Sequence, residues 1–163
     1  MPYDITITGP ETRALIELRG AQSTLAAHAP DLLPVWPARP CSAVHHAGRA
    51  LLWLGPDRWV LMASLDQEDT LQTALCDTYW PDAGMTLISD TLAFFTLSGQ
   101  DAEVAMAIAC PLDLHADVFA PDTVAQTDAF GVRALVLRTD EGWLLAVEAA
   151  YTRYIAEHLA QIV

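Results

Sequence analysis

Residues 50–61, ALLWLGPDRWVL, decide the fold of this chain, because residues 134–145, ALVLRTDEGWLL, repeat their pattern. In both stretches an apolar run of strand length leads through a short polar turn to a tryptophan and a second apolar run. Two such runs around a turn rich in Gly, Pro or Asp predict a β-hairpin. The same hairpin is therefore expected once in each half of the chain.

A second, weaker repeat supports this duplication. Leu18-Arg19-Gly20 opens a run of small residues, and Leu97-Ser98-Gly99 opens another. Gly20 and Gly99 are expected to meet a backbone requirement at a strand-to-helix turn. Each half then reads strand, helix, two hairpin strands, helix. This order predicts an α+β fold, mainly antiparallel sheet with helices packed on it, in a single domain 1–163 with halves of about 1–82 and 83–163.

Period-two patterns and short apolar runs locate the strands. We expect them at residues 14–19, 50–54, 59–63, 91–98, 124–130, 132–139 and 143–148, with a possible edge strand at 3–8.

Three helices have recognisable apolar faces. The first is capped by Asp66, ends before Pro81, and is expected to bury Leu71, Leu75 and Tyr79. The second spans 100–109 and is expected to bury Val104, Ala105 and Ile108. The third spans 150–162 and is expected to bury Tyr151, Ile155, Leu159 and Ile162.

The charge of the chain restricts its partners. Its 163 residues carry a net charge of −13, with arginine as the only strongly basic residue. Nucleic acids and anionic membranes are poor partners, because neutralising phosphate requires a basic patch. The acidic surface either meets a basic protein partner or serves only for solubility. No apolar run reaches the length of a membrane span, no secretory signal is visible, and three scattered cysteines fit reduced thiols, so we expect a cytoplasmic protein.

The sequence shows no motif for catalysis or cofactor binding. Cys41, His45 and His46 could suggest zinc, but no second ligand pair follows at a suitable spacing. No Gly-x-Ser-x-Gly turn, Gly-rich phosphate loop or P-loop occurs. We therefore expect no catalytic, cofactor-binding or metal-binding residue on this chain.

The residues that stand out have structural or interface roles. Trp59 and Trp143 occupy equivalent hairpin places, which predicts a core position in each half. Asp113, just after Pro111, is expected to anchor a turn. Trp36 lies in the proline-rich stretch 30–40, where it is either an exposed interface residue or packed down on the core. The candidates are Trp59, Trp143, Gly20, Gly99, Asp113 and Trp36.

Several stretches, taken in order, resemble a known family. They are LWLGPDRW at 52–59, LSG at 97–99, CPLDL at 110–114, FAP at 119–121 and the closing amphipathic helix, together covering about residues 50–159. This series is similar to the gamma subunit of bacterial heterotetrameric sarcosine oxidase.

The resemblance implies a fold similar to the folate-binding domain of the glycine-cleavage aminomethyltransferase, which itself carries two related halves. It also implies a non-catalytic subunit of an enzyme that demethylates sarcosine to glycine with oxygen, making peroxide and methylene-tetrahydrofolate. The partners would be the alpha, beta and delta subunits. FAD, FMN, NAD and tetrahydrofolate would be bound by those partners.

The chain departs from the family pattern at three places. Leu87-Ile88-Ser89 lacks an expected acid, Gln126 replaces an arginine, and Ala149-Ala150-Tyr151 replaces Arg-Ser-Phe. One alternative is a stand-alone folate-binding or one-carbon-transfer protein of the same fold, although a pterin needs a carboxylate to pair with its amino-pyrimidine edge. Another alternative is a complex for a related N-methyl amine such as dimethylglycine.

Overall fold

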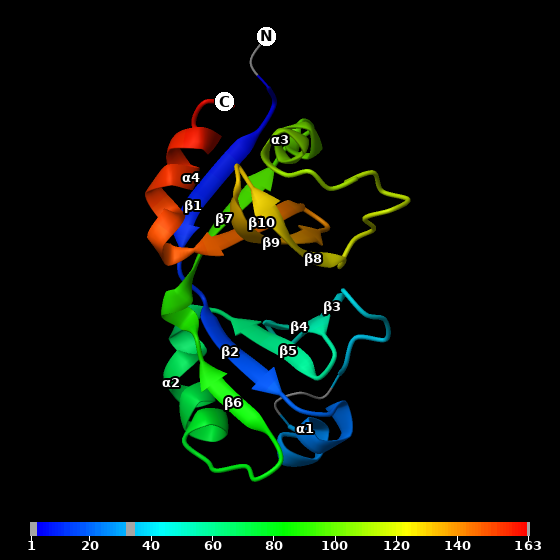
Figure 1. The fold of residues 1–163 in the computed structure, drawn as a ribbon, viewed down its shortest axis with the longest axis vertical. Helices are drawn as coiled ribbons and strands as arrows, with labels where there is room; N and C mark the ends of the chain where they lie inside the picture. Colours follow the sequence, from blue (N-terminus) through cyan, green and yellow to red (C-terminus); the bar gives the residue numbers. More distant parts are fainter. Residues whose placement is uncertain (1–2, 32–34, 163) are drawn as a thin grey trace. The chain divides into compact units, whose positions relative to one another are not determined.

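The computed structural model describes residues 3–31 and 35–162, so part of the proline-rich stretch 30–40 lies outside the described residues (Figure 1). The chain forms two compact units. The N-terminal unit is Arg13–Ser89, and the C-terminal unit is Met1–Thr12 with Asp90–Val163. Each unit is built around its own five-stranded antiparallel sheet.

The sheet of the N-terminal unit has the order β3-β4-β5-β2-β6. Its strands are β2 Ala14–Arg19, β3 Ala43–His46, β4 Arg49–Gly55, β5 Arg58–Ala63 and β6 Gly84–Leu87. Helix α1 is Gln22–His28, and a second helical segment combines the 3₁₀ turn Leu65–Gln67, α2 Glu68–Leu71 and the π-helical turn Gln72–Cys76. The core of this unit gathers Leu18, Leu25, Trp59, Leu61, Leu71 and Leu75.

The sheet of the C-terminal unit has the order β1-β7-β10-β9-β8. Its strands are β1 Thr6–Glu11, β7 Leu92–Ser98, β8 Val124–Ala129, β9 Val132–Thr139 and β10 Gly142–Glu148. The 3₁₀ turn Ser89–Thr91 precedes β7, helix α3 is Ala102–Ala109, and the 3₁₀ turn Ala149–Tyr151 leads into α4 Thr152–Leu159. Both helices pack on one face, because Met106 of α3 and Ile155 of α4 share a core cluster with Trp143, Leu145 and Val147 of β10.

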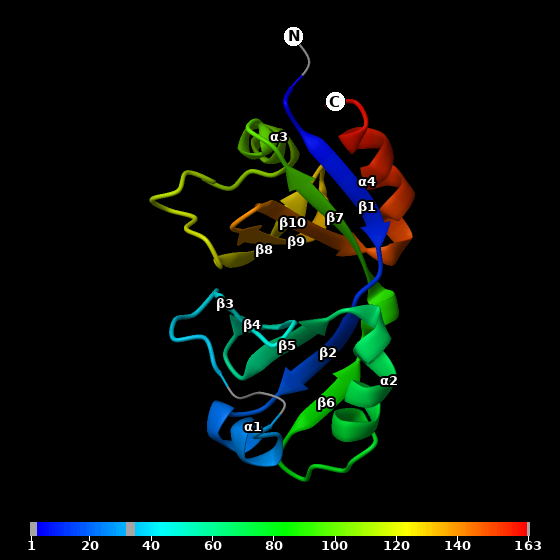
Figure 2. The ribbon, with the colours of Figure 1, turned by 180° about the vertical axis from the view of Figure 1, so that it is seen from behind.

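The two sheets correspond strand by strand, which reveals an exchange at the start of each repeat. Read from its other edge, the sheet of the N-terminal unit has the order β6-β2-β5-β4-β3. This order matches the order β1-β7-β10-β9-β8 of the C-terminal unit at each position. The first strand of each repeat therefore pairs in the sheet of the other repeat: β1 lies beside β7, and β6 lies beside β2 (Figures 1 and 2). The expected α+β fold with antiparallel sheets is confirmed. Because of the exchange, the compact units divide between Thr12 and Arg13 and between Ser89 and Asp90, and not at the boundary between the two repeats.

Most strands lie where the sequence placed them, with three differences. The edge strand expected at 3–8 is found at Thr6–Glu11. β3 and β6, each of four residues, were not predicted. The two predicted hairpins are present as β4–β5 and β9–β10.

The buried faces of the helices differ from the prediction. In the helical segment after β5, Leu71 and Leu75 are buried, but Tyr79 is 85% exposed. The π-helical turn adds a residue to its turn and so changes the phase of the pattern, and the helix ends before Asp77. The N-cap of α2 is Gln67, with no side-chain cap hydrogen bond, so the cap expected from Asp66 is wrong.

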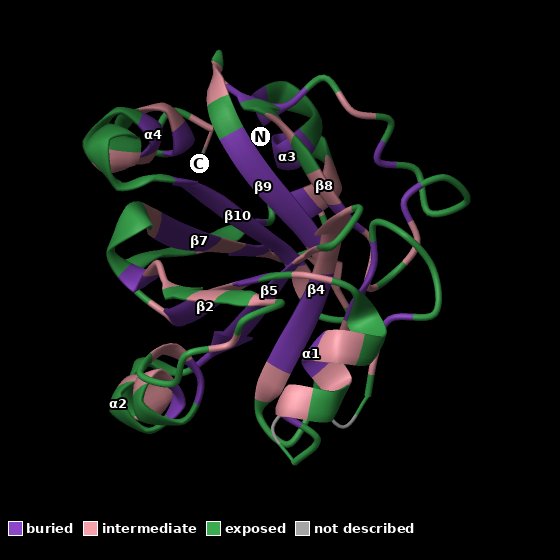
Figure 3. Ribbon diagram, turned by 60° about the horizontal axis from the view of Figure 1, so that its bottom comes forward, coloured by how far each residue is buried: buried purple, intermediate pink, exposed green. Residues whose placement is uncertain are grey.

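In α3, Ala105 is buried as expected, but the other two residues expected on the buried face are not. Ala102, Ala105, Met106 and Ala109 face the core, whereas Val104 and Ile108 are 45% and 52% exposed. In α4, Ile155 and Leu159 are buried as expected, Ile162 packs partly against the core, and Tyr151 is exposed. Figure 3 shows the buried residues concentrated along the strands. None of the helices in residues 3–31 and 35–162 combines the length and apolar composition that crossing a bilayer requires.

Candidate functional site

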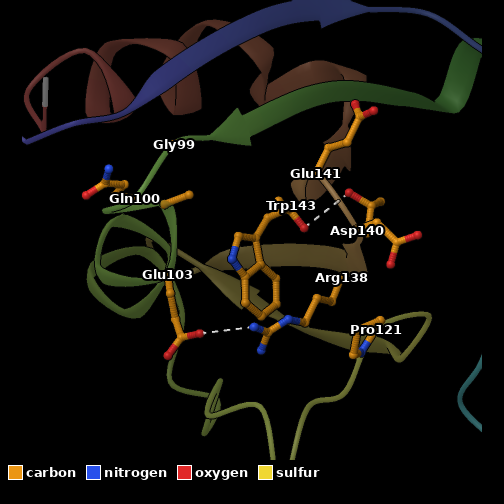
Figure 4. A pocket seen from close by; sticks show the side chains of 11 residues that line it. Gly99, Gln100, Glu103, Pro121, Arg138, Asp140, Glu141 and Trp143 are labelled. Atoms are coloured by element: carbon orange, nitrogen blue, oxygen red, sulfur yellow. Dashed lines mark hydrogen bonds and ion pairs between the residues drawn. The ribbon is translucent and has the colours of Figure 1, made fainter.

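A surface hollow of about 320 Å³ lies in the C-terminal unit, where the start of α3 meets the β9–β10 hairpin (Figure 4). Gly99, Gln100 and Glu103 line it from the α3 side. The strand ends and the turn supply the other side, together with Pro121. Those hairpin residues are Arg138, Thr139, Asp140, Glu141, Gly142 and Trp143.

Arg138 is the central residue of the hollow, and its guanidinium has partners in several directions. Its Nη1 donates hydrogen bonds to the carbonyl oxygens of Leu114 and Phe119, at 3.0 Å each. Its Nη2 lies 3.4 Å from a carboxylate oxygen of Glu103. The guanidinium also lies over the ring of Trp143, 5.0 Å from the centroid. Arg138 therefore connects the loop after α3 to the hairpin.

The turn at the rim of the hollow has a backbone conformation that requires glycine at position 142. Thr139 Oγ1 donates to the carbonyl oxygen of Gly142 at 3.2 Å. Gly142 has φ +142, and a Cβ at this position would collide with the carbonyl oxygen of Leu97 on the neighbouring strand β7. Glycine is the residue that fits such a close approach of two backbones. The start of β10 therefore packs closely against β7.

The charge of the hollow is predominantly negative. Asp140 and Glu141 are exposed at the turn, and Glu103 is half-exposed on α3. Arg138 is the one guanidinium in the lining, and it is engaged with Glu103 and with two carbonyls. The hollow is therefore chemically suited to receive a cationic group from outside. Within the described part of the chain, no group of three or more His, Cys, Asp or Glu side chains could hold a metal ion.

The two hairpin tryptophans occupy equivalent buried positions in their units. Trp59 faces Leu18 across β5 and β2, and Trp143 faces Leu97 across β10 and β7. Each indole is 2% exposed.

Trp36 packs against this position in the N-terminal unit. It is partly buried and meets Trp59 edge to face with ring centroids 4.8 Å apart, while Trp53 stacks on Trp59 at 4.7 Å. The Nε1 atoms of Trp36 and Trp59 are buried and have no hydrogen-bond partner among the described residues. Of the two alternatives expected for Trp36, an exposed interface residue or a residue packed on the core, the structure shows the second.

The remaining candidates serve the backbone. Gly20 and Gly99 have φ +140 and +109, at the ends of equivalent strands. The Gly20 amide donates to the carbonyl oxygen of Asp57 at 3.0 Å. Asp113 Oδ1 accepts a hydrogen bond from the amide of His115 at 3.1 Å, which forms an Asx-type turn. Only Gly99 and Trp143 of the six candidates line the hollow.

Two polar groups in the N-terminal unit, a pair and a cluster of three residues, were missed by the sequence reasoning. His28 Nε2 lies 2.7 Å from Asp82 Oδ1, and the imidazole packs on Trp80 with ring centroids 4.4 Å apart. The hydrogen bond from His28 outweighs the small effect of burial and lowers the pKa of Asp82. These residues are far apart in the sequence, so no local motif could have indicated the pair.

The second group is a cluster of three residues centred on Glu17 of β2. Arg19 Nη2 and Arg58 Nε both donate to its Oε1, at 3.1 and 2.9 Å. Burial alone would raise the pKa of Glu17, but the two arginines outweigh burial, and the pKa lies below its ordinary value. Arg58 ends the sequence GPDR at 55–58, the turn of the predicted hairpin. Its charge beside a strand could have indicated an ion pair with an acidic residue of a neighbouring strand.

Comparisons with known proteins place this architecture. The chain is 32% identical over 117 residues to the sarcosine oxidase gamma subunit of Corynebacterium sp. strain U-96, a match that covers 69% of this chain and 55% of the relative. The gamma subunit of Corynebacterium sp. strain P-1 is 30% identical over 114 residues, with the same coverage of both chains. This chain is related to sarcosine oxidase gamma subunits. The resemblance predicted from the sequence is therefore confirmed, and the chain spans about half the length of the curated relatives it matches.

Solved structures agree on the fold. A chain of the heterotetrameric sarcosine oxidase of Corynebacterium sp. U-96 superposes with a TM-score of 0.78 at 24% identity, covering 97% of this chain and 85% of that one. The aminomethyltransferase T of the Bartonella henselae glycine cleavage system superposes with a TM-score of 0.72 at 13% identity, covering 97% of this chain and 46% of that one. The fold is thus the one expected from the resemblance. No protein-family model matches the chain.

Proposed function

We propose that this chain acts as the non-catalytic gamma subunit of a heterotetrameric sarcosine-oxidase-type complex. The observation that carries the proposal is the relation to sarcosine oxidase gamma subunits at 32% identity over 69% of the chain. The structural match covers nearly the whole chain and supports the same assignment at the level of the fold. The activity of the complex would be oxidative demethylation of sarcosine to glycine, with peroxide and methylene-tetrahydrofolate as products.

The chemistry of that reaction belongs, in this proposal, to the companion chains. Alpha, beta and delta subunits would bind FAD, FMN, NAD and tetrahydrofolate. In this chain the guanidinium of Arg138 is engaged by two carbonyl oxygens of the loop after α3, which is a structural role. We also propose a cytoplasmic location, since the three free cysteines Cys41, Cys76 and Cys110 suit a reducing compartment.

Gentle purification of the tagged chain from its own host tests this function. We expect larger companion chains, a visible flavin absorbance, and peroxide production that depends on added sarcosine. Replacing sarcosine by dimethylglycine in the same assay identifies a complex for a different N-methyl amine. A colourless chain recovered alone would contradict the proposal.

The alternative of a stand-alone folate protein rests on the fold match to aminomethyltransferase T. It predicts that the colourless isolated chain binds tetrahydrofolate with micromolar affinity in a calorimetric titration. A gamma subunit whose companions carry the folate site gives no heat in that titration. The two functions are therefore separated by two measurements, the purification from the host and the titration of the isolated chain.

A further inference from the structure

The outer face of α3 carries apolar side chains where a solvent-exposed helix carries polar ones. Val104, Ala107 and Ile108 are exposed and lie at the spacing of one helical face. The opposite side of the helix, including Ala105 and Met106, is buried in the core. A helix that is apolar on all sides is typical of a helix covered on all sides. Figure 3 shows both buried and exposed stretches on α3.

Helix α4 provides an internal comparison, because it has the same length and packs on the same sheet face. Its exposed side carries the ion pair of Arg153 and Glu157 at 2.8 Å, with the arginine 92% exposed. This is the usual surface of a helix in contact with water. The apolar outer face of α3 is therefore a property of that helix and not of the unit as a whole.

The apolar face adjoins the acidic hollow. Successive residues of a helix are about 100° apart, so Glu103 lies at the border of the face formed by Val104, Ala107 and Ile108. From there Glu103 points toward Arg138 across the hollow (Figure 4). Asp140 and Glu141 line the same hollow. The surface thus combines an apolar stripe with a negative depression at its edge.

We propose that this surface, the outer face of α3 with the hollow beside it, is where a companion subunit docks. The occupant is a larger chain with an apolar patch, bordered by an arginine or lysine that enters the hollow near Glu103, Asp140 and Glu141. This inference rests on the proposed function, since it names the surface by which the subunit joins its complex. A second copy of the chain is a poor occupant, because two acidic borders repel and each chain carries a net charge of −13.

The energetic roles of the two parts differ. Burying Val104 and Ile108 stabilises the bound state, because apolar area is removed from water. The carboxylates attract a basic border from a distance and fix its register, so they act mainly on the association rate. Salt is expected to slow association without abolishing the complex.

The decisive variants place a charge on the apolar stripe. Val104→Glu and Ile108→Glu keep the helix, because glutamate is a better helix former than valine or isoleucine. Tyr151→Glu is the matched control: Tyr151 is 43% exposed, close to the 45% of Val104, and lies just before α4. For the double variant Val104→Glu/Ile108→Glu, we expect the amount of companion chain recovered per tagged chain from the host to fall about tenfold or more. Tyr151→Glu should recover as much as the wild type.

Two further readouts make the result specific. In the intact complex, hydrogen exchange of the α3 amides should be slower than in the isolated chain, whereas the α4 amides should not change. Asp140→Asn/Glu141→Gln should slow reassembly with the separated companion chains and weaken its dependence on salt. Thermal unfolding of every variant, measured alongside, shows that the fold is retained.

The outcomes separate the inference from the function on which it rests. Full recovery of companions by the α3 double variant, with unchanged exchange of α3 amides, overturns the docking surface and leaves the subunit function intact. A wild-type chain that recovers no companion overturns both. An isolated chain that sediments as a dimer, and as a monomer once Val104→Glu is introduced, assigns the surface to a second copy and also overturns the proposal.

Discussion

Arg138 lies over the indole ring of Trp143, its direct partner across strands β9 and β10, with 5.0 Å from the guanidinium carbon to the ring centroid. The same guanidinium donates to two main-chain carbonyls in the loop after α3. A planar group with donors in fixed directions is needed to satisfy these partners at once. One side chain therefore joins the hairpin, the loop and, through Glu103, the helix.

Replacing Arg138 tests this connection. Arg138→Ala leaves two carbonyl acceptors without their donor and removes the contact with the ring, so we expect the free energy of unfolding to fall by about 1–3 kcal/mol. Arg138→Lys should restore only part of the loss, because an ammonium cannot reproduce the fork of the guanidinium. Urea denaturation measures both. Arg153→Ala, at a 92% exposed position, is the control and should change stability by less than about 0.5 kcal/mol.

Trp59 is expected to be the most costly aromatic residue to remove from the N-terminal unit. Its ring is 2% exposed and lies between Trp36 and Trp53. Trp59→Ala should lower the free energy of unfolding by about 3–5 kcal/mol, because it leaves a large cavity. Tyr79→Ala, at an 85% exposed ring, should stay within about 0.5 kcal/mol of the parent in the same denaturation experiment. Equal midpoints for the two variants would contradict the core role of Trp59.

The strands were predictable because their signal is local. Each of β4, β5, β9 and β10 is a run of apolar residues that ends at a turn, and the repetition of the pattern fixed the pairing within each hairpin. β3 and β6 were missed, since four residues of mixed polarity give too short a pattern. The exchange of β1 and β6 between the sheets depends on long-range pairing, for which the sequence carries no local signal.

The helix faces and the hollow were harder to predict, for different reasons. In α3, nearly every residue is apolar, so periodicity gives no phase, and Val104 and Ile108 were placed on the wrong side. The hollow brings together Glu103 and Arg138 from distant elements, a contact that depends on the assembled sheet. Of the residues singled out from the sequence, Trp143 and Gly99 are the two that line the hollow.

Glu17 is expected to make the stability of the chain sensitive to acid. Its pKa is lower in the folded chain than in the unfolded chain, where a glutamate titrates near about 4.3, because Arg19 and Arg58 stabilise the carboxylate more than burial opposes it. The stabilisation is therefore present above that value and is lost as the pH falls through the lowered folded pKa. Thermal melts of wild type and Glu17→Gln should differ most at neutral pH and converge at acidic pH. The difference at neutral pH should be below about 1 kcal/mol, because the pair is partly exposed.

Three glycines separate backbone strain from steric collision. Gly55 has an ordinary φ and open space on the side where a methyl group would point. Gly131 also has open space, but its φ is +81. Gly99 has φ +109, and the carbonyl oxygen of Asp4 lies where its Cβ would be. We expect Gly55→Ala to be nearly neutral and Gly131→Ala to cost about 1 kcal/mol, the strain of the left-handed conformation alone. Gly99→Ala should cost at least about 2 kcal/mol, since the same strain is joined by a collision with the segment that leads into β1. Denaturation midpoints measure this order, and a Gly99→Ala variant as stable as Gly131→Ala would show that the segment around Asp4 gives way without cost.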